Sequence, residues 1–142
     1  MVEVDPDNEA TFKVCVIPSE QRATAAPKEA IMQEVEACGF GPDAIFRIKL
    51  ALEEALTNAV KHGNRCDPNK QVVIRYAVND TKAVVIIRDE GQGFDPDCVP
   101  DPTSPERLPL PNGRGIMLMK AYMDEVEYRD CGREVYFVKK RQ

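Results

Sequence analysis

The chain has 142 residues, of which 43% are hydrophobic; this length and content fit one domain over residues 1–142 and argue against disorder of the whole chain. A net charge of −5 argues against a broad basic surface for nucleic acid. The five cysteines form no CxxC pair, which indicates reduced thiols in a cytoplasmic protein and disfavours a zinc site. The sequence contains no apolar run long enough to cross a membrane, and its acidic start does not resemble a signal peptide.

The first half of the chain predicts one strand followed by helices. A strand is expected over Thr11–Ile17, where Phe, Val and Ile mix with polar residues before a proline. The chain then indicates helix from about Ser19 to Cys38, either as one helix or as two pieces near Pro27. A second helix is expected to begin with Asp43 as its cap and to run to Gly63, because its apolar residues recur at helical spacing.

The second half predicts two hairpins with a short helix between them. Gln71–Asn79 and Lys82–Asp89 are rich in Val and Ile and form the first predicted hairpin. Gly115–Met123 indicates a short helix, and Glu125–Arg129 with Glu134–Lys140 predicts the final hairpin. Helices that alternate with hairpins favour an α/β two-layer sandwich, with a mostly antiparallel mixed sheet covered by helices on one face.

The second helix carries the first candidate site. Glu54, Asn58 and Lys61 or His62 lie three or four residues apart and therefore share one face, which we expect opposite the apolar stripe. A solvated face explains the same spacing, but Thr57 and Asn58 are mediocre helix formers for such a face. A carboxylate and a carboxamide oxygen one turn apart can hold Mg²⁺ together with phosphates and waters. His62 is the single histidine of the chain and is not expected as a metal ligand.

A Gly-x-Gly pair, Gly91 and Gly93, follows the strand that ends at Asp89. Glycine lets the backbone approach a ligand closely, and a carboxylate, which only accepts hydrogen bonds, suits an exocyclic amine. A turn that ends the strand explains the same residues. The motif alone therefore leaves both interpretations open.

A second pair, Gly113 and Gly115, has Arg114 between its members and opens the next helix. Free N–H groups at a helix start suit phosphate oxygens, although a flexible helix start explains the pair equally well. Six prolines lie between the two pairs, at about residues 95–112. Because proline fixes φ and lacks an N–H donor, we expect little regular structure there and motion about the glycine ends. Neither pair completes GxGxxG and no P-loop motif occurs, which excludes both of those nucleotide sites.

In chain order these motifs resemble the boxes of the GHKL ATPase superfamily. Glu54–Gly63 resembles its N box, Asp89–Phe94 its G1 box and Gly113–Met119 its G2 box. Met123–Tyr128 is similar to the tail of small bacterial members that act as anti-sigma factor serine/threonine kinases. The resemblance extends from about residue 12 to residue 140.

This resemblance implies the Bergerat fold, an α/β sandwich that holds ATP between helices and a lid, here residues 95–112. By the family pattern Asn58 would ligate Mg²⁺, Glu54 would be the general base or orient a water, and Asp89 would accept a hydrogen bond from the adenine amino group. The further residues that the resemblance implies at the ATP site are His62, Gly91, Gly93, Gly113, Arg114 and Gly115.

The resemblance also implies a function. It points to an ATP-dependent serine/threonine protein kinase that acts as an anti-sigma factor and phosphorylates an anti-anti-sigma partner of the STAS type. Such proteins hold a sigma factor in the cytoplasm, are often homodimers, and bind neither nucleic acid nor membrane directly. The single histidine lies within the N box, so a sensor histidine kinase with its own phosphoacceptor histidine is not expected.

One departure from the pattern lies near the end of the chain. Similar proteins often open the last strand with a Gly-Thr pair whose hydroxyl helps to bind adenine, whereas this chain has Gly132 and Arg133. The departure supports one alternative, a nucleotide-gated protein-binding module with little catalysis. A stressosome-type kinase that does not bind a sigma factor is the other alternative.

Overall fold

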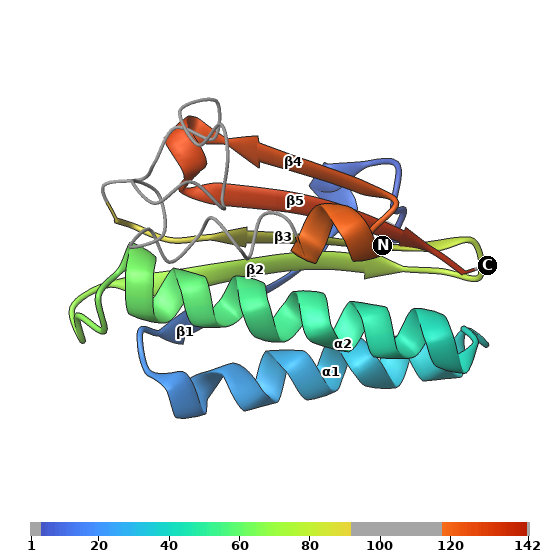
Figure 1. Cartoon of the computed structure of the whole chain (residues 1–142), viewed down its shortest axis with the longest axis horizontal. Helices are drawn as coiled ribbons and strands as arrows, with labels where there is room; N and C mark the ends of the chain where they lie inside the picture. Colours follow the sequence, from blue (N-terminus) through green and yellow to red (C-terminus); the bar gives the residue numbers. More distant parts are fainter. Residues whose placement is uncertain (1–3, 92–117, 142) are drawn as a thin grey trace.

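The computed structural model describes residues 4–91 and 118–141, and in them two long helices and a short helical segment at residues 118–122 lie on one face of a single sheet (Figure 1). The sheet has five strands in the order β1-β2-β3-β5-β4, and every described strand pair is antiparallel. The strands are β1 Lys13–Pro18, β2 Gln71–Val78, β3 Lys82–Arg88, β4 Glu125–Arg129 and β5 Glu134–Lys140. The predicted α/β two-layer sandwich is confirmed, and both predicted hairpins form.

The two long helices are α1 (Ala25–Ala37) and α2 (Pro42–Thr57), which lie side by side in Figure 1. The predicted first helical segment is divided, because a 3₁₀ turn at Gln21–Thr24 precedes α1. Shorter 3₁₀ turns lie at Glu9–Thr11 and Asp130–Gly132. In the described part of the chain no helix is both long and apolar enough to cross a membrane.

The prediction that Asp43 caps the second helix is wrong. Gly41 is the N-cap, and its carbonyl oxygen accepts from the Ile45 N–H at 3.0 Å. The reason is Pro42, which suits the first helical position because its ring fixes φ and its missing N–H would have had no partner there. The Asp43 carboxylate instead pairs with Arg47 one turn later, at 2.9 Å.

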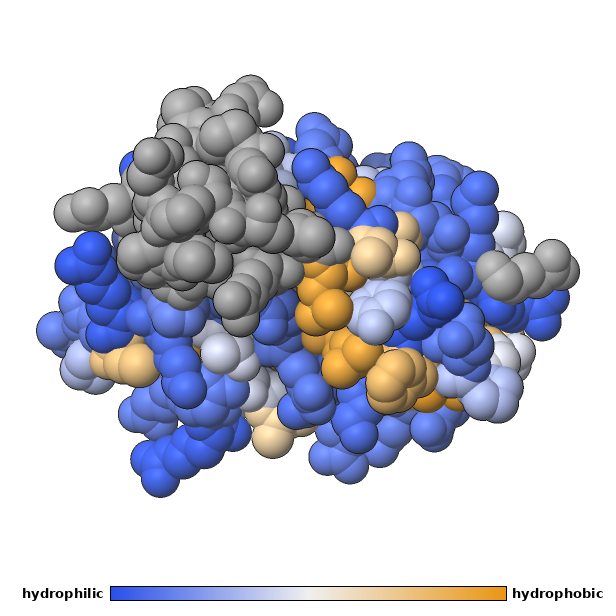
Figure 2. All heavy atoms as spheres, in the orientation of Figure 1, coloured by the Kyte–Doolittle hydropathy of each residue, from blue (hydrophilic) through white to orange (hydrophobic). Residues whose placement is uncertain are grey.

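The core lies between the helices and the sheet. Ile48, Leu52 and Leu56 of α2 are almost fully buried, and they pack in one cluster with residues such as Ile74 and Phe137 of the sheet. A smaller cluster, built around Phe12, covers part of the opposite face of the sheet. Seen in the same orientation, most of the molecular surface is hydrophilic, and one band of hydrophobic residues lies near the centre of the view (Figure 2).

The helical segment after α2 changes its geometry before it ends. The sequence predicts helix up to Gly63, and the structure continues it that far, but as a π-helix over Asn58–Gly63. The main-chain N–H of Asn64 accordingly donates to the Ala59 carbonyl, five residues back, at 2.9 Å. Such wider turns occur often at functional sites, because they redirect side chains at the end of a helix.

Asn64 then joins the end of this segment to the sheet. Its side chain is 1% exposed; its Nδ2 donates to Ser19 Oγ at 2.5 Å and to the Gln71 carbonyl at 2.9 Å. Its Oδ1 accepts from the Glu90 main-chain N–H at 2.7 Å. One buried amide therefore connects the end of the helix to three separate parts of the chain, at Ser19, Gln71 and Glu90.

Replacing this amide tests the joint. Asn64→Ala is expected to lower the free energy of unfolding by about 3 kcal/mol, because each buried group left without a partner costs about 1–3 kcal/mol. Urea unfolding measures the loss, and Asn69→Ala is the control, since Asn69 is exposed and its main-chain N–H, which the substitution keeps, donates to Asp67. Equal effects of the two substitutions would contradict the role given to Asn64.

Candidate nucleotide site

A pocket lies between the π-helical end of the second helix and the edge of the sheet where β3 ends and β5 begins. The helical side contributes Ala55, Asn58, Ala59, His62 and Gly63. The sheet side contributes Ile87, Asp89, Arg133 and Val135, and further lining residues are Arg65, Met119, Tyr128 and Gly132. Segments that are far apart in sequence thus form one concave site, which is the usual form of a small-molecule site.

The structure brings together part of the predicted site. Asn58, His62 and Asp89 line the pocket, Gly91 is hydrogen-bonded to Asp89, and Glu54 is hydrogen-bonded to Asn58. The predicted residues Gly93, Gly113, Arg114 and Gly115 and the predicted lid at about 95–112 lie outside the described residues.

Asn58 lines the helical wall of the pocket and is paired with Glu54, one turn earlier in the helix. The amide Nδ2 of Asn58 donates to Glu54 Oε1 at 3.2 Å, which leaves the amide oxygen of Asn58 as an available acceptor. The expectation that this polar face lies opposite the apolar stripe is wrong, because Ala55 and Ala59 of that stripe line the same pocket as Asn58. The two small side chains leave room beside Asn58, so the apolar and polar residues share one wall.

Asp89 stands where β3 ends. Its Oδ1 accepts from the Gly91 N–H at 2.8 Å, and its own main-chain N–H donates to the Arg133 carbonyl at 2.8 Å. Burial raises the pKa of Asp89, while the bond from Gly91 and the positive charges of Arg133 and Arg88 partly oppose this rise. The carboxylate is therefore a half-buried acceptor held in one orientation.

Two glycines allow the helical wall to touch this strand end. A Cβ at Gly63 would overlap the Asp89 carboxylate, and a Cβ at Gly91 would overlap the carbonyl oxygen of Gly63. Neither glycine has a positive φ, so the requirement is for space and not for an unusual backbone conformation. Any other residue at either position would push the two walls apart.

Tyr128 and Met119 line the pocket but were not among the predicted site residues, although they end the motif segments Met123–Tyr128 and Gly113–Met119. The Tyr128 hydroxyl lies 3.9 Å from the Met119 sulfur. Burial, and then the negative charge of Glu54, raise the pKa of Tyr128 well above its ordinary value, which keeps the phenol neutral. The alternation of residues along β4 could have indicated that Tyr128 faces the helices. Its contact with Met119 is set by tertiary packing and has no signal in the sequence.

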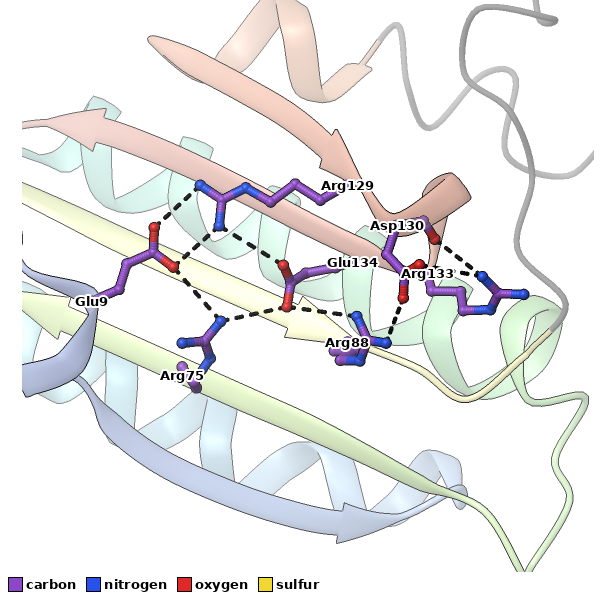
Figure 3. Close-up of polar contacts among 7 residues, drawn as sticks. All are labelled: Glu9, Arg75, Arg88, Arg129, Asp130, Arg133 and Glu134. Atoms are coloured by element: carbon purple, nitrogen blue, oxygen red, sulfur yellow. Dashed lines mark hydrogen bonds and ion pairs between the residues drawn. The ribbon is translucent and has the colours of Figure 1, made fainter.

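Arginines and carboxylates form a network along the opposite side of the sheet and reach the pocket at Arg133 (Figure 3). Glu134, whose side chain is 12% exposed, pairs with Arg75, Arg88 and Arg129 at 3.4–4.0 Å. Arg129 also pairs with Glu9, and Arg88 with Asp130. Asp130 in turn pairs with Arg133 at 3.5 Å.

The chain belongs to a known family of nucleotide-binding domains. Residues 17–139 match the family model described as the histidine kinase-like ATPase domain. The chain is also 30% identical over 130 residues to the serine-protein kinase RsbW of Bacillus subtilis, covering 87% of this chain and 81% of that protein. Its identity to RsbW of Bacillus licheniformis is 34% over 111 residues, covering 71% and 68% of the two chains. This similarity identifies the chain as an enzyme of the serine/threonine kinase class that uses ATP.

A solved structure shares the fold. The crystal structure of the RsbU and RsbW domains of Rv1364c from Mycobacterium tuberculosis superposes with a TM-score of 0.55 and 16% sequence identity. The match covers 90% of this chain and 32% of that one. The arrangement of strands and helices is therefore that of a known fold.

The glycine contact can be tested by adding one methyl group. Gly91→Ala is expected to destabilise the protein by about 1–3 kcal/mol, because the Cβ would overlap a backbone oxygen that cannot move away cheaply. Thermal or urea unfolding measures the change. Gly41→Ala is the matched control, since nothing lies within 4 Å of a Cβ built there. A Gly91→Ala variant as stable as the control would refute the close contact.

A pH series tests the environment of Asp89. Because the pKa of Asp89 is raised by burial, the ionised carboxylate destabilises the folded state once the pH rises through that pKa. Asp89→Asn keeps the acceptor for Gly91 and removes the charge. The variant is expected to be more stable than wild type at neutral pH without nucleotide, and this advantage should shrink towards about pH 4 and below, where the carboxyl is protonated in both states.

Urea unfolding at each pH measures this difference. Asp80→Asn, in the exposed turn between β2 and β3, is the control for removing a carboxylate elsewhere. A pH-independent loss of stability in Asp89→Asn would contradict a raised pKa at this position.

Proposed function

We propose that this kinase acts as an anti-sigma factor and phosphorylates a serine or threonine of a STAS-type anti-anti-sigma protein. The observation that carries the proposal is the pocket in which Asn58, bonded to Glu54, lines one wall and the Asp89 strand end lines the other. The similarity to the serine-protein kinases named RsbW supports the partner class.

In this proposal the sheet side of the pocket binds the base of ATP. Asp89 accepts from the exocyclic amino group of adenine, since its carboxylate is held by Gly91 and is a pure acceptor when ionised. Gly63 and Gly91 keep the two walls close enough to enclose the base. His62 is exposed on the rim of the helical wall, where it contacts the sugar or phosphates.

The phosphates are assigned to the second glycine pair. Gly113, Arg114 and Gly115 present main-chain N–H groups and one positive charge to the phosphate oxygens, and Gly93 shapes the pocket beside Gly91. The proline-rich segment at about 95–112 acts as the lid over the nucleotide. These assignments rest on the sequence motifs.

The helical wall suits a magnesium ion bound together with phosphates. Among the described residues no group of three or more His, Cys, Asp or Glu could hold a metal. The amide oxygen of Asn58 fits the requirement, because its amide nitrogen is already bonded to Glu54 and the oxygen is a hard ligand. When bound, Mg²⁺ would neutralise charge on the phosphates.

Glu54 is then the general base. Its carboxylate takes the proton from the hydroxyl of the substrate serine or threonine as that oxygen bonds to the γ-phosphorus, and ADP leaves. Asn58 holds Glu54 in place through the 3.2 Å hydrogen bond, and the neutral Tyr128 close to it adds no competing charge. Catalysis of this kind depends mainly on positioning.

The biological role proposed is partner switching. The protein holds a sigma factor until the unphosphorylated STAS protein displaces that factor, and phosphorylation of the STAS protein reverses the exchange. We place it in the cytoplasm, in keeping with the free cysteines Cys15, Cys38 and Cys66, and expect a homodimer without direct binding to nucleic acid or membrane.

A second candidate function is a nucleotide-gated binding module with little catalysis. Arg133 favours it, because this side chain lines the pocket where similar proteins often carry threonine. Tight ATP binding without phosphotransfer to any STAS protein would support it. A stressosome-type kinase would phosphorylate its partner but would not co-purify with a sigma factor, so a pull-down with sigma factors separates this alternative from the first.

The kinase activity is tested by transfer of labelled phosphate. Purified protein is mixed with Mg²⁺, ATP labelled at the γ-phosphate and the STAS protein encoded nearest to it. We expect labelled serine or threonine, and a loss of at least about 100-fold in rate for Glu54→Gln and Asn58→Ala. Glu53→Gln is the control, because this adjacent carboxylate pairs with Lys28, whereas Glu54 is bonded to the pocket residue Asn58. Unlabelled partner, beside a labelled positive-control pair, would count against the proposal.

A further inference from the structure

Arg133 and Asp89 are direct neighbours on the sheet side of the pocket. The pairing of β3 with β5 places Ile87 opposite Val135 and Arg88 opposite Glu134, and the 2.8 Å bond from the Asp89 N–H to the Arg133 carbonyl continues this ladder by one residue. Asp89 and Arg133 both line the pocket, together with the strand pair Ile87 and Val135.

The guanidinium of Arg133 is held in one position. Its Nε donates to the Gly91 carbonyl at 2.8 Å, and its Nη1 lies 3.4 Å from the Asp130 carbonyl and 3.5 Å from the Asp130 carboxylate. Figure 3 shows the other terminal nitrogen turned away from Asp130. Within the described part of the chain, Nη2 has no hydrogen-bond acceptor.

Asp130 is itself anchored. It pairs with Arg88, and Arg88 pairs with Glu134, whose side chain is 12% exposed. The position of Asp130, and through it that of Arg133, is therefore set by charged residues on the opposite side of the sheet (Figure 3). A guanidinium fixed in advance loses less conformational freedom when it binds a ligand than a free side chain does.

One wall of the pocket thus presents an acceptor and a charged donor side by side. Adenine carries a complementary pair on one edge, since its exocyclic amino group donates and the adjacent ring nitrogen N1 accepts. We infer that Arg133 is a specificity-determining residue, whose guanidinium donates to N1 of adenine while Asp89 accepts from the amino group. This inference rests on the proposed ATP site and assigns a direct contact to the residue that departs from the family pattern.

The test uses a nucleotide that lacks only the acceptor. In 1-deaza-ATP a C–H group replaces N1 and the amino group is retained, so the contact to Asp89 is kept. Calorimetry with Mg²⁺ should give wild-type protein a dissociation constant about 10-fold or more weaker for 1-deaza-ATP than for ATP, the effect of one charge-assisted hydrogen bond.

Two variants attribute this difference to Arg133. Arg133→Met keeps an extended side chain without a donor and should bind ATP and 1-deaza-ATP with equal affinity. Arg129→Met removes another arginine of the same network, one that pairs with Glu9 and does not line the pocket, and should discriminate as wild type does.

Several results would overturn the inference. Equal affinity of wild-type protein for the two nucleotides would do so without any variant, even if Arg133→Met failed to fold. If Arg133→Met still bound ATP more tightly than 1-deaza-ATP, Arg133 would only stabilise the turn at Gly91 and would not contact N1. Tighter binding of GTP than of ATP would assign the pair to guanine, whose O6 accepts and whose N1–H donates. If wild-type protein bound no ATP at all, the proposed function itself would fail, a result distinct from binding without discrimination.

Discussion

The site depends on the contact between the end of the second helix and the end of β3. The carbonyl of Gly63 and the carboxylate of Asp89 occupy the space that a Cβ at Gly91 or Gly63 would need. This contact sets the distance between the helical layer and the sheet at one end of the molecule. Asn64, the residue after Gly63, also holds the end of the helix to the sheet, because it is hydrogen-bonded to Ser19, Gln71 and Glu90.

With this distance fixed, the chemistry divides between the two walls. The helical wall offers the oxygen of Asn58, whose amide nitrogen is bonded to Glu54, and the sheet wall offers the acceptor Asp89 beside the donor Arg133. The ion pairs behind the sheet hold Arg133 through Asp130. The close contact between helix and strand and the ion pairs that hold Arg133 thus act on different sides of one site. Changes in either of them are expected to affect nucleotide binding.

Most of the fold and part of the site could be predicted from the sequence. Hydrophobic residues and turn residues predicted both hairpins correctly, because the residue pattern of a strand is a local property of the sequence. The cap at Asp43 was wrong, because proline at the first helical position moves the start of the helix. The predicted position of Asn58 opposite the alanines was also wrong, because what packs against a helix decides which of its faces borders a pocket. The π-helical turn after Thr57 likewise depends on tertiary contacts at the end of the helix.

The sequence by itself determined the order of the elements, the motif residues Glu54, Asn58 and Asp89, and the departure at Arg133, since all of these are properties of local spacing and residue type. Only the tertiary structure decided which of them meet. Glycine in a sequence shows that space is needed but not which atoms fill it, and here a carboxylate and a carbonyl from distant segments do so. The direction of the Arg133 side chain was likewise decided by long-range contacts, because Gly91 and the network through Asp130 and Arg88 hold it.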